Sequence, residues 1–419
     1  MSLVELAIDD LRCIERAELQ LHPGHNLFCG GNGSGKTSLL EAIFLLGRGR
    51  SFRTRSSERL IRYGRERLVV FGRTGGLAPG GFGRGNAGVR TDDVGGASVS
   101  ATDARTERRL WDLPINPVQD NGSMQLGHFD SIQSGGLGLA GQNLLGQALG
   151  VQVSRTDGTT ARISGANTRS LTELTQAFPV QVIDPGIHKL VEEGGHRRRR
   201  WMDWAVFHVE HQFGDWWLRY TRALKQRNAA LRTHPAQAGA WDSELIRLGE
   251  LIAAARGRFV EGLLPYWTEL VLALSGLEPE LHYFKGWAQE TSLAEALASS
   301  RARDESKRIT HPGPHRADVI IRMKGRPARE ILSRGQQKLI AVAMTLSQLH
   351  LVKAATQTTP TLLLDDPAAE LDGHHLKRFI DQILRLESQL ILTSLQPESH
   401  LFGKPDRVFH VEQGRVKPA

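Results

Sequence analysis

The feature that most constrains the chain is a glycine-rich segment near its N-terminus, which matches the pattern G-x-x-x-x-G-K-[ST] in full. An apolar stretch, 27–29, precedes the segment and an apolar run, 39–46, follows it, so we expect a strand, a loop and a helix. Glycines let backbone N–H groups converge on an anion, and a helix N-terminus adds partial positive charge. The sequence predicts a nucleoside triphosphate site formed by Gly30, Gly31, Asn32, Gly33, Ser34, Gly35, Lys36, Thr37 and Ser38.

Two side chains of this loop have specific predicted roles. We expect the ammonium of Lys36 to reach the β- and γ-phosphates and to act in catalysis, and the hydroxyl of Thr37 to bind Mg²⁺. A glycine turn without a ligand is the alternative. The strand and helix patterns on either side favour the phosphate site.

A short apolar run near the C-terminus, Thr361-Leu362-Leu363-Leu364, predicts a strand that is covered on both faces of a parallel sheet. Two aspartates follow it. Asp365 is the predicted Mg²⁺ ligand, and Asp366 is the predicted catalytic carboxylate that positions or deprotonates the attacking water. These aspartates could instead cap a following helix, but the glycine loop favours the metal site.

The segment Leu332-Ser333-Arg334-Gly335-Gln336 precedes a helical pattern of apolar residues, with Ser333 as the predicted N-cap. It resembles the signature motif of ATP-binding-cassette ATPases. This resemblance implies an α/β ATPase head with a mixed sheet, in which Ser333, Gly335 and Gln336 contact ATP held by a second copy of the domain and Ser333 acts in catalysis. Simple helix capping is the alternative role of Ser333. The segment 369–372 looks like the loop that crosses such a dimer interface, with Ala369 where Ser is usual.

Further motifs, in order along the chain, make the resemblance more specific: 11–15, 49–54, 198–203, 225–228, 313–318 and 333–338. Together they are similar to the RecF family of bacterial DNA replication and repair ATPases over most of the length. The resemblance implies ATP and Mg²⁺ as cofactors, an ATP-dependent homodimer and slow, DNA-stimulated hydrolysis. It also implies binding to single-stranded, gapped or junction DNA, and work with RecO and RecR in loading recombinase.

The expected organisation is an ATPase head interrupted twice. Residues 1–72 and 146–196 form its N-terminal part, with a hairpin across Val151 to Ile163, and residues 305–419 complete it. Residues 73–145 form a Gly-rich insertion that we expect to be flexible. Residues 197–304 form a helical second lobe. Its aromatic residues recur at helical spacing, which favours core packing over base stacking: Trp201, Trp204, Phe213, Trp217 and Tyr220.

The chain is basic, with 53 Lys plus Arg against 45 Asp plus Glu and a net charge of +8. Such a balance favours polyanionic partners. Two arginine-rich stretches, 48–67 and 197–200, are candidate DNA contacts, with a solvated charged face as the alternative. The second stretch begins a predicted helix, where positive charge opposes the helix dipole, so we expect an anion or a carboxylate to offset it.

Two other classes remain open. An SMC-like structural ATPase would need long heptad repeats, and the interval between Thr37 and Leu332 contains none. An ATPase-coupled nuclease would need a further metal domain, for which the residues after Asp372 are too few. Only two cysteines occur, Cys13 and Cys29, both predicted to be buried in strands, and they favour a reducing, cytoplasmic location. We expect no membrane partner, because no apolar run has spanning length.

Overall fold

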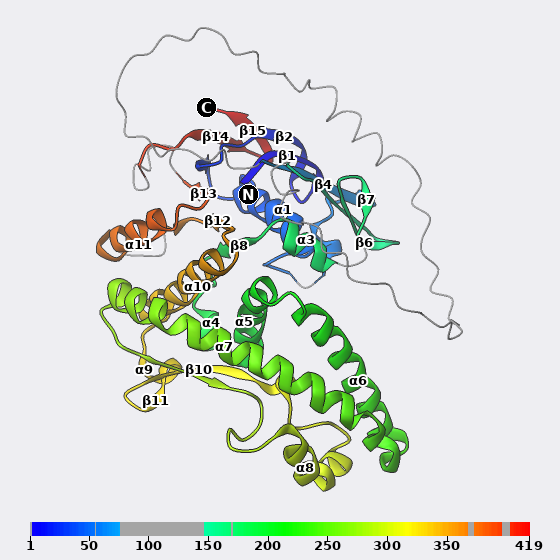
Figure 1. The fold of residues 1–419 in the computed structure, drawn as a ribbon. Helices are drawn as coiled ribbons and strands as arrows, with labels where there is room; N and C mark the ends of the chain where they lie inside the picture. The colour runs from blue at the N-terminus through cyan, green and yellow to red at the C-terminus, as the bar shows by residue number, and fades with distance from the viewer. Residues whose placement is uncertain (1, 55, 76–145, 169–170, 368–372, 396–402) are drawn as a thin grey trace, which may run out of the picture. The chain divides into compact units, whose positions relative to one another are not determined.

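The structure is a computed structural model that describes residues 2–54, 56–75, 146–168, 171–367, 373–395 and 403–419 (Figure 1). Most of the expected insertion, the expected interface loop 369–372 and Arg55 lie outside the described residues. The chain divides into two compact units. Residues 1–23, 41–178 and 413–415 form the first unit, and residues 24–40, 179–412 and 416–419 form the second.

The first unit contains an antiparallel sheet with the strand order β2-β1-β4-β5-β6-β7. The expected hairpin is confirmed, because Val151 of β5 pairs with Ala161 of β6. Strand β4 continues past residue 72, where we expected the insertion to begin, and Gly75 pairs with Ser2. The strands are β1 (Ser2–Leu11), β2 (Ile14–Gln20), β4 (Arg67–Gly75), β5 (Ala148–Ser154), β6 (Gly158–Ile163) and β7 (Ala166–Asn167).

The turn between β1 and β2 corrects one expectation. Cys13 is exposed in this turn and is not buried in a strand. The chain reverses here because Leu11 pairs with Ile14, and Arg12 takes a positive φ of 51°. Cys29 is buried at the end of its strand, as expected, and both thiols are free.

The second unit contains a sheet with the order β15-β14-β3-β13-β12-β8, in which β14, β3, β13, β12 and β8 pair in parallel. All of β12 is buried, so the predicted buried strand is confirmed. Parallel pairing places the carboxyl ends of these strands at one edge. The strands are β3 (His25–Cys29), β8 (Val180–Ile183), β12 (Thr361–Leu364), β13 (Leu390–Ser394), β14 (Arg407–Glu412) and β15 (Arg415–Pro418).

Helices make up most of the remaining second unit, and α7 packs against both α6 and α10 (Figure 1). The expected core role of the aromatic residues is confirmed for Trp201, Trp204, Phe213 and Tyr220, which are buried. Trp217 packs against the same core and is partly buried. The helices are α4 (Lys189–Glu192), α5 (Gly195–Val209), α6 (Phe213–Thr233), α7 (Asp242–Ser275), α8 (Leu293–Lys307), α9 (Ala328–Ile331), α10 (Arg334–Thr356) and α11 (Gly373–Arg385).

A small antiparallel sheet, β11-β10-β9, interrupts the stretch that we expected to be helical. Strand β9 (Glu280–Phe284) pairs with β10 (Asp318–Met323), and β10 pairs with β11 (Arg326–Pro327). This pairing joins segments on both sides of residue 304, where the sequence suggested a boundary.

Helix α10 is the one helix among the described residues that has the length and hydropathy to cross a membrane. However, 67% of its apolar window is buried inside the protein. Its apolar residues pack in the core of the second unit, including Ile340, Ala343 and Leu346. Burial of this kind is typical of a core helix.

Candidate nucleotide-binding site

The predicted strand, glycine loop and helix are confirmed, because β3 ends at Cys29 and helix α1 (Lys36–Arg48) begins at Lys36. Gly33 and Gly35 have φ values of 76° and 114°, which L residues rarely adopt. A Cβ atom at Gly30 would lie 2.1 Å from the carbonyl oxygen of Val411 on β14. The neighbouring strand therefore leaves no space for a side chain at the start of the loop.

Burial divides the loop residues into two groups. Gly31, Asn32 and Gly33 are exposed, whereas Ser34, Lys36 and Ser38 are buried. The ammonium of Lys36, 7% exposed, donates to the carbonyl oxygens of Gly30 and Gly31 at 2.6 and 2.9 Å. The buried hydroxyl of Ser34 has no hydrogen-bond partner among the described residues. A buried cation and an unsatisfied hydroxyl in one loop fit an anionic ligand.

Thr37 and Asp365 are brought together, as we expected for two ligands of one metal. The Thr37 hydroxyl donates to the carboxylate of Asp365, with its oxygen 3.0 and 3.1 Å from Oδ1 and Oδ2. Thr393, near the end of β13, also donates to Asp365 Oδ1 at 2.9 Å. Sequence reasoning missed Thr393, although the polar end of the apolar run 390–394 was a usable signal.

Asp366 follows in an unusual backbone conformation, with a φ of 46°. Its N–H donates to Thr393 Oγ1 at 2.9 Å, so Thr393 holds both aspartates in place. Burial raises the pKa of Asp366 above its ordinary value, while Lys36 opposes that rise and Asp365 adds to it. Asp366 therefore has the raised affinity for a proton that a base requires.

The arrangement of oxygen atoms fits Mg²⁺. Magnesium prefers octahedral oxygen coordination and is usually held by one or two carboxylates together with phosphate oxygens and waters. The hydroxyl of Thr37 and the carboxylate of Asp365 can supply two such oxygens. The described residues contain no cluster of three or more His, Cys, Asp or Glu side chains with metal-binding geometry. A site that relies on the phosphates of the nucleotide needs no such cluster.

Ser333 is the N-cap of α10, as predicted. Its hydroxyl accepts from the Gln336 N–H at 3.3 Å, and the Gln336 side chain accepts from the Ser333 N–H at 3.0 Å. Within the described part of the chain, the side chain of Ser333 hydrogen-bonds only inside this capping box, its carbonyl oxygen accepts from the Gln337 N–H at 2.9 Å, and no bond joins Ser333 to the glycine loop. Gly335 is exposed, and no heavy atom of the residues that the structure describes lies within 4 Å of the position of a Cβ. The start of α10 is thus rigid and accessible.

Arg334 links this motif to a residue that sequence reasoning missed. Its guanidinium donates to Nε2 of the buried His188 at 3.1 Å. Burial and the charge of Arg334 lower the pKa of His188, so the imidazole is neutral and can accept this hydrogen bond. His188 belongs to the segment that follows β8, so the signature-like motif is fixed to the strand beside β12.

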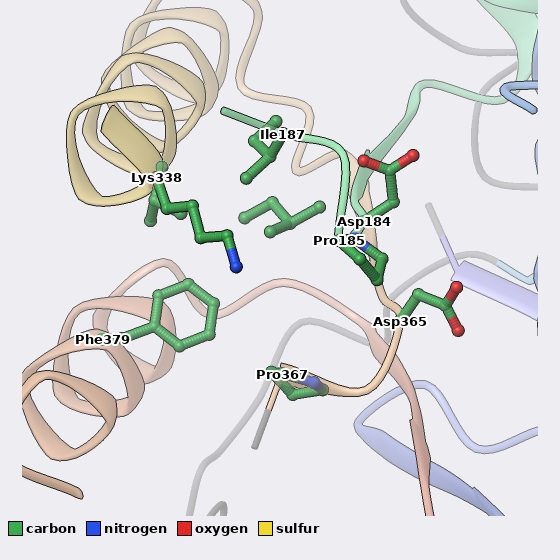
Figure 2. A pocket seen from close by; sticks show the side chains of 9 residues that line it. Asp184, Pro185, Ile187, Lys338, Asp365, Pro367 and Phe379 are labelled. Carbon is green, nitrogen blue, oxygen red and sulfur yellow. The ribbon is translucent and has the colours of Figure 1, made fainter. Parts of the chain in front are cut away.

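A pocket lies where β8 and β12 end (Figure 2). Lys338 extends into it from α10, and Phe379 from α11 forms part of its wall. Asp184, another residue that sequence reasoning missed, lies directly after β8. Burial raises the pKa of Asp184, and the nearby charge of Asp365 adds to that rise. The sheet edge therefore carries a third carboxylate beside Asp365 and Asp366.

A buried carboxylate on α1 also escaped prediction. Glu41, 0% exposed, accepts from Arg12 Nε and Nη2 at 2.5 and 2.9 Å and from the Ser51 hydroxyl at 2.5 Å. Arg53 lies 3.5 Å from the same carboxylate. The charged residue inside the apolar run 39–46 was the available signal. Two motifs of the sequence, 11–15 and 49–54, are thus joined through Glu41.

Several of the candidate DNA-contacting arginines have carboxylate partners within the chain. Arg53, Arg62 and Arg65 lie within 4 Å of carboxylates of Glu41, Asp10 or Glu15. Arg198 is buried and forms a bidentate pair with Asp318 at 2.8 and 2.9 Å. Arg197 pairs with Glu193. The expected carboxylate partners of the second arginine stretch are therefore confirmed for Arg197 and Arg198. The buried Arg198 is held inside the protein by its ion pair.

The family model described as "RecF/RecN/SMC N terminal domain" matches residues 2–74 and 141–417. The chain is 34% identical to the DNA replication and repair protein RecF of Cellvibrio japonicus, with 99% of each chain covered. It is 33% identical to that of Pseudomonas aeruginosa, with coverage of 99% of this chain and 97% of the relative.

Among solved structures, the recombination mediator protein RecF in its RecF-ATP structure matches with a TM-score of 0.77 at 22% identity, covering 100% of this chain and 97% of that one. An SMC head bound to the C-terminal winged-helix domain of ScpA matches with a TM-score of 0.52 at 14% identity, with coverage of 100% and 97%. These likenesses confirm the expected fold class, an α/β ATPase head with a mixed sheet and additional helices.

Proposed function

Because the chain belongs to the RecF family, we propose that it is an ATP-controlled DNA-binding protein of DNA replication and recombinational repair. In this proposal ATP brings two copies together head to head, and slow, DNA-stimulated hydrolysis separates them. The DNA bound is single-stranded, gapped or a junction. The protein acts in the cytoplasm with RecO and RecR to load recombinase.

The observation that carries the proposal is the contact between Thr37 and Asp365 at the edge of the parallel sheet. It supports a Mg²⁺–ATP site in which these residues hold the ion, which would neutralise charge on the phosphates. Lys36 and the backbone N–H groups of residues 30–35 would bind the phosphates. An ammonium has three N–H donors, and Lys36 directs two to the loop carbonyls, so little movement would present it to a phosphate.

Asp366 is the residue that we assign to the attacking water. Its raised pKa favours acceptance of a proton, and its backbone is fixed by the bond to Thr393. The short aspartate side chain suits slow turnover. A slow switch needs a long-lived ATP state more than a fast chemical step.

We assign to the start of α10 the contact with ATP bound by a second copy, made by Ser333, Gly335 and Gln336. The accessibility of Ser333 and Gly335 and the rigid capping box support this role, because a preorganised helix N-terminus can accept a phosphate that approaches from outside. The start of α10 would then act in trans, which makes ATP part of the dimer interface.

Sedimentation velocity of the full chain tests the proposal. We expect dimers with Mg²⁺ and ATP and monomers with ADP or without nucleotide. Addition of gapped DNA to the ATP sample should produce a heavier species and faster hydrolysis. Monomers under every nucleotide condition would refute the ATP-controlled dimer, and the absence of a DNA complex would refute DNA binding.

A further inference from the structure

The first unit contains an open pocket that the nucleotide site does not use. Its lining consists of Ser56, Glu58, Arg59, Ile61, Tyr63 and Arg155. We call these residues the Tyr63 pocket. They come from the short helix η1 (Ser57–Leu60) and its N-cap Ser56, the segment that follows the helix and the turn between β5 and β6.

Tyr63 is 99% exposed, which is unusual for a large aromatic residue. The backbone around it is fixed, because the Arg65 N–H donates to the Arg62 carbonyl at 3.1 Å and Gly64 takes a positive φ of 77°. This turn holds Tyr63 away from the protein. An exposed ring on a hydrogen-bonded turn offers a face for stacking.

Carboxylate partners distinguish the arginines of the pocket from Arg62 and Arg65, which lie close to them in the sequence. Arg62 and Arg65 have carboxylate neighbours, namely Asp10 and Glu15. Arg59 has no ion pair with any described residue. Among the described residues, the guanidinium of Arg155 donates to the carbonyl oxygen of Arg65 alone, at 3.2 Å, and a neutral carbonyl does not offset its charge.

The charges of the lining favour an anionic ligand. Arg59 and Arg155 contribute two positive charges, and Glu58 contributes the negative charge that opposes them. The backbone N–H of Arg155 also donates to the Glu66 carbonyl at 3.1 Å, and that of Arg62 to the Asp10 carbonyl at 2.9 Å. Both sides of the pocket are therefore built on hydrogen-bonded backbone.

We infer that the Tyr63 pocket binds single-stranded DNA, with one unpaired base stacked on Tyr63 and neighbouring phosphates bound by Arg59 and Arg155. The inference rests on the DNA binding proposed above and locates the contact with single-stranded DNA at the Tyr63 pocket. Exposed aromatic faces stack on unpaired bases, whereas the bases of a duplex are already stacked on each other. Arginine binds phosphate through its planar fork of donors. The pocket combines both kinds of group.

The experiment measures the affinity of the full chain for fluorescently labelled oligothymidine and for the duplex of the same strand, by anisotropy with ATP present. Tyr63→Ala should weaken single-strand binding by about fivefold to about a hundredfold, which is the range for loss of one stacked base. It should leave duplex affinity within about twofold. Tyr63→Phe retains the ring and should bind like the original protein.

Salt dependence tests the arginines. Arg59→Gln and Arg155→Gln should each reduce the slope of log affinity against log salt for the single strand by about 0.7, because each removes one phosphate contact. Arg16→Gln is the matched control, since Arg16 is an exposed arginine of the same unit that already pairs with Glu18. ATP-induced dimerisation should be unchanged in all variants, which confirms that they fold.

Unchanged single-strand affinity in Tyr63→Ala, Arg59→Gln and Arg155→Gln would overturn the inference and leave an acidic protein partner as the next occupant to test. Equal losses for single strand and duplex in Tyr63→Ala would also overturn it, because stacking on an unpaired base would not be the interaction. These outcomes leave the proposed function intact if the original protein binds DNA. Failure of the original protein to bind either oligonucleotide would instead remove the proposed DNA binding itself.

Discussion

The hydroxyl of Thr37 contacts both carboxylate oxygens of Asp365, although 328 positions separate the two residues in the sequence. Strands β3 and β12 both pair in parallel with β13, so their carboxyl ends lie at the same edge of the sheet. Backbone pairing thus assembles the predicted metal ligands. A site assembled in this way loses little entropy when it binds its ligand.

Replacement of Lys36 by alanine should abolish ATP-dependent dimerisation. Lys36 is the buried cation of the loop, and loss of a hydrogen bond to a charged group costs about 1.5–3 kcal/mol, or roughly tenfold to a hundredfold in ATP affinity. Sedimentation velocity with ATP measures the effect. Lys307→Ala, at an exposed position of α8, is the control. ATP-induced dimers of Lys36→Ala equal to those of the original protein would exclude the glycine loop from the switch.

Asp366→Asn should have the opposite phenotype. An amide cannot take a proton from water, so hydrolysis should fall by about a hundredfold or more while ATP binding persists. The ATP-bound dimer should therefore last longer, as measured by its dissociation after dilution. Asp381→Asn, at an exposed position of α11, should dissociate at the normal rate. Complete loss of ATP binding in Asp366→Asn would reassign Asp366 to the metal or to the fold.

Ser333→Arg should spare ATP binding by the monomer and prevent dimer closure, because the larger cation would occupy the space of the second copy. Ser292→Arg is a closely matched control, since Ser292 forms the same kind of capping box at the start of α8. Both variants should lose about 1 kcal/mol of capping energy, but only Ser333→Arg should fail to dimerise.

A mixture makes the Ser333 test stricter. Ser333→Arg retains an intact glycine loop and Lys36→Ala retains an intact Ser333, so one composite site can form in a heterodimer of the two. We expect partial recovery of ATP-dependent association in the mixture. If Ser333→Arg fails to bind ATP as a monomer, then Ser333 contributes to the pocket of its own subunit and the model of action in trans is wrong.

Glu41→Gln should destabilise the protein strongly. The change removes the charge of the fully buried Glu41 and leaves Arg12, whose side chain is 27% exposed, without that partner; removal of one member of a fully buried ion pair costs about 3–5 kcal/mol, which is the upper bound here. The midpoint of urea unfolding measures the loss. Glu18→Gln, an exposed glutamate paired with Arg16, should change the midpoint little. Similar midpoints for the two variants would show that the buried cluster contributes no more than a surface pair.

His315 should make the protein less stable at low pH. Burial lowers its pKa to about 4, and its Nδ1 contacts the Tyr220 hydroxyl at 2.7 Å. The unfolded chain binds a proton near pH 6.5, whereas the folded chain does not until about pH 4. Stability is therefore fully present above about pH 6.5 and should fall by about 3 kcal/mol as the pH falls to about 4.

Urea unfolding of His315→Gln and of the original protein at pH 7 and pH 4.5 isolates the contribution of His315 to the pH dependence of stability. The variant should lose less stability between the two pH values than the original protein. His282→Gln, at an exposed histidine beside Glu280, should retain the original dependence. An identical pH dependence in His315→Gln and the original protein would show that His315 takes up its proton equally in both states.

Arg334 and Arg198 show why part of the site could not be predicted. Each is an arginine in a motif; for Arg198 the sequence predicts an anion or a carboxylate without saying which one, and for Arg334 it predicts no partner. The structure gives Arg334 the buried His188 and gives Arg198 the carboxylate of Asp318. Both partners are distant in sequence, and a one-dimensional pattern contains no information about which strand or helix approaches which side chain.

The sequence by itself determined the elements whose cause is local. Glycines that permit positive φ, an apolar run long enough for one buried strand and a serine three residues before a glutamine specified the loop, β12 and the start of α10. Only the tertiary structure decided the contacts of Glu41, Thr393 and Tyr63. Burial, pairing and exposure of a side chain depend on neighbours brought together by the fold, and similar sequence patterns can place an arginine or an aromatic residue in the core or in solvent.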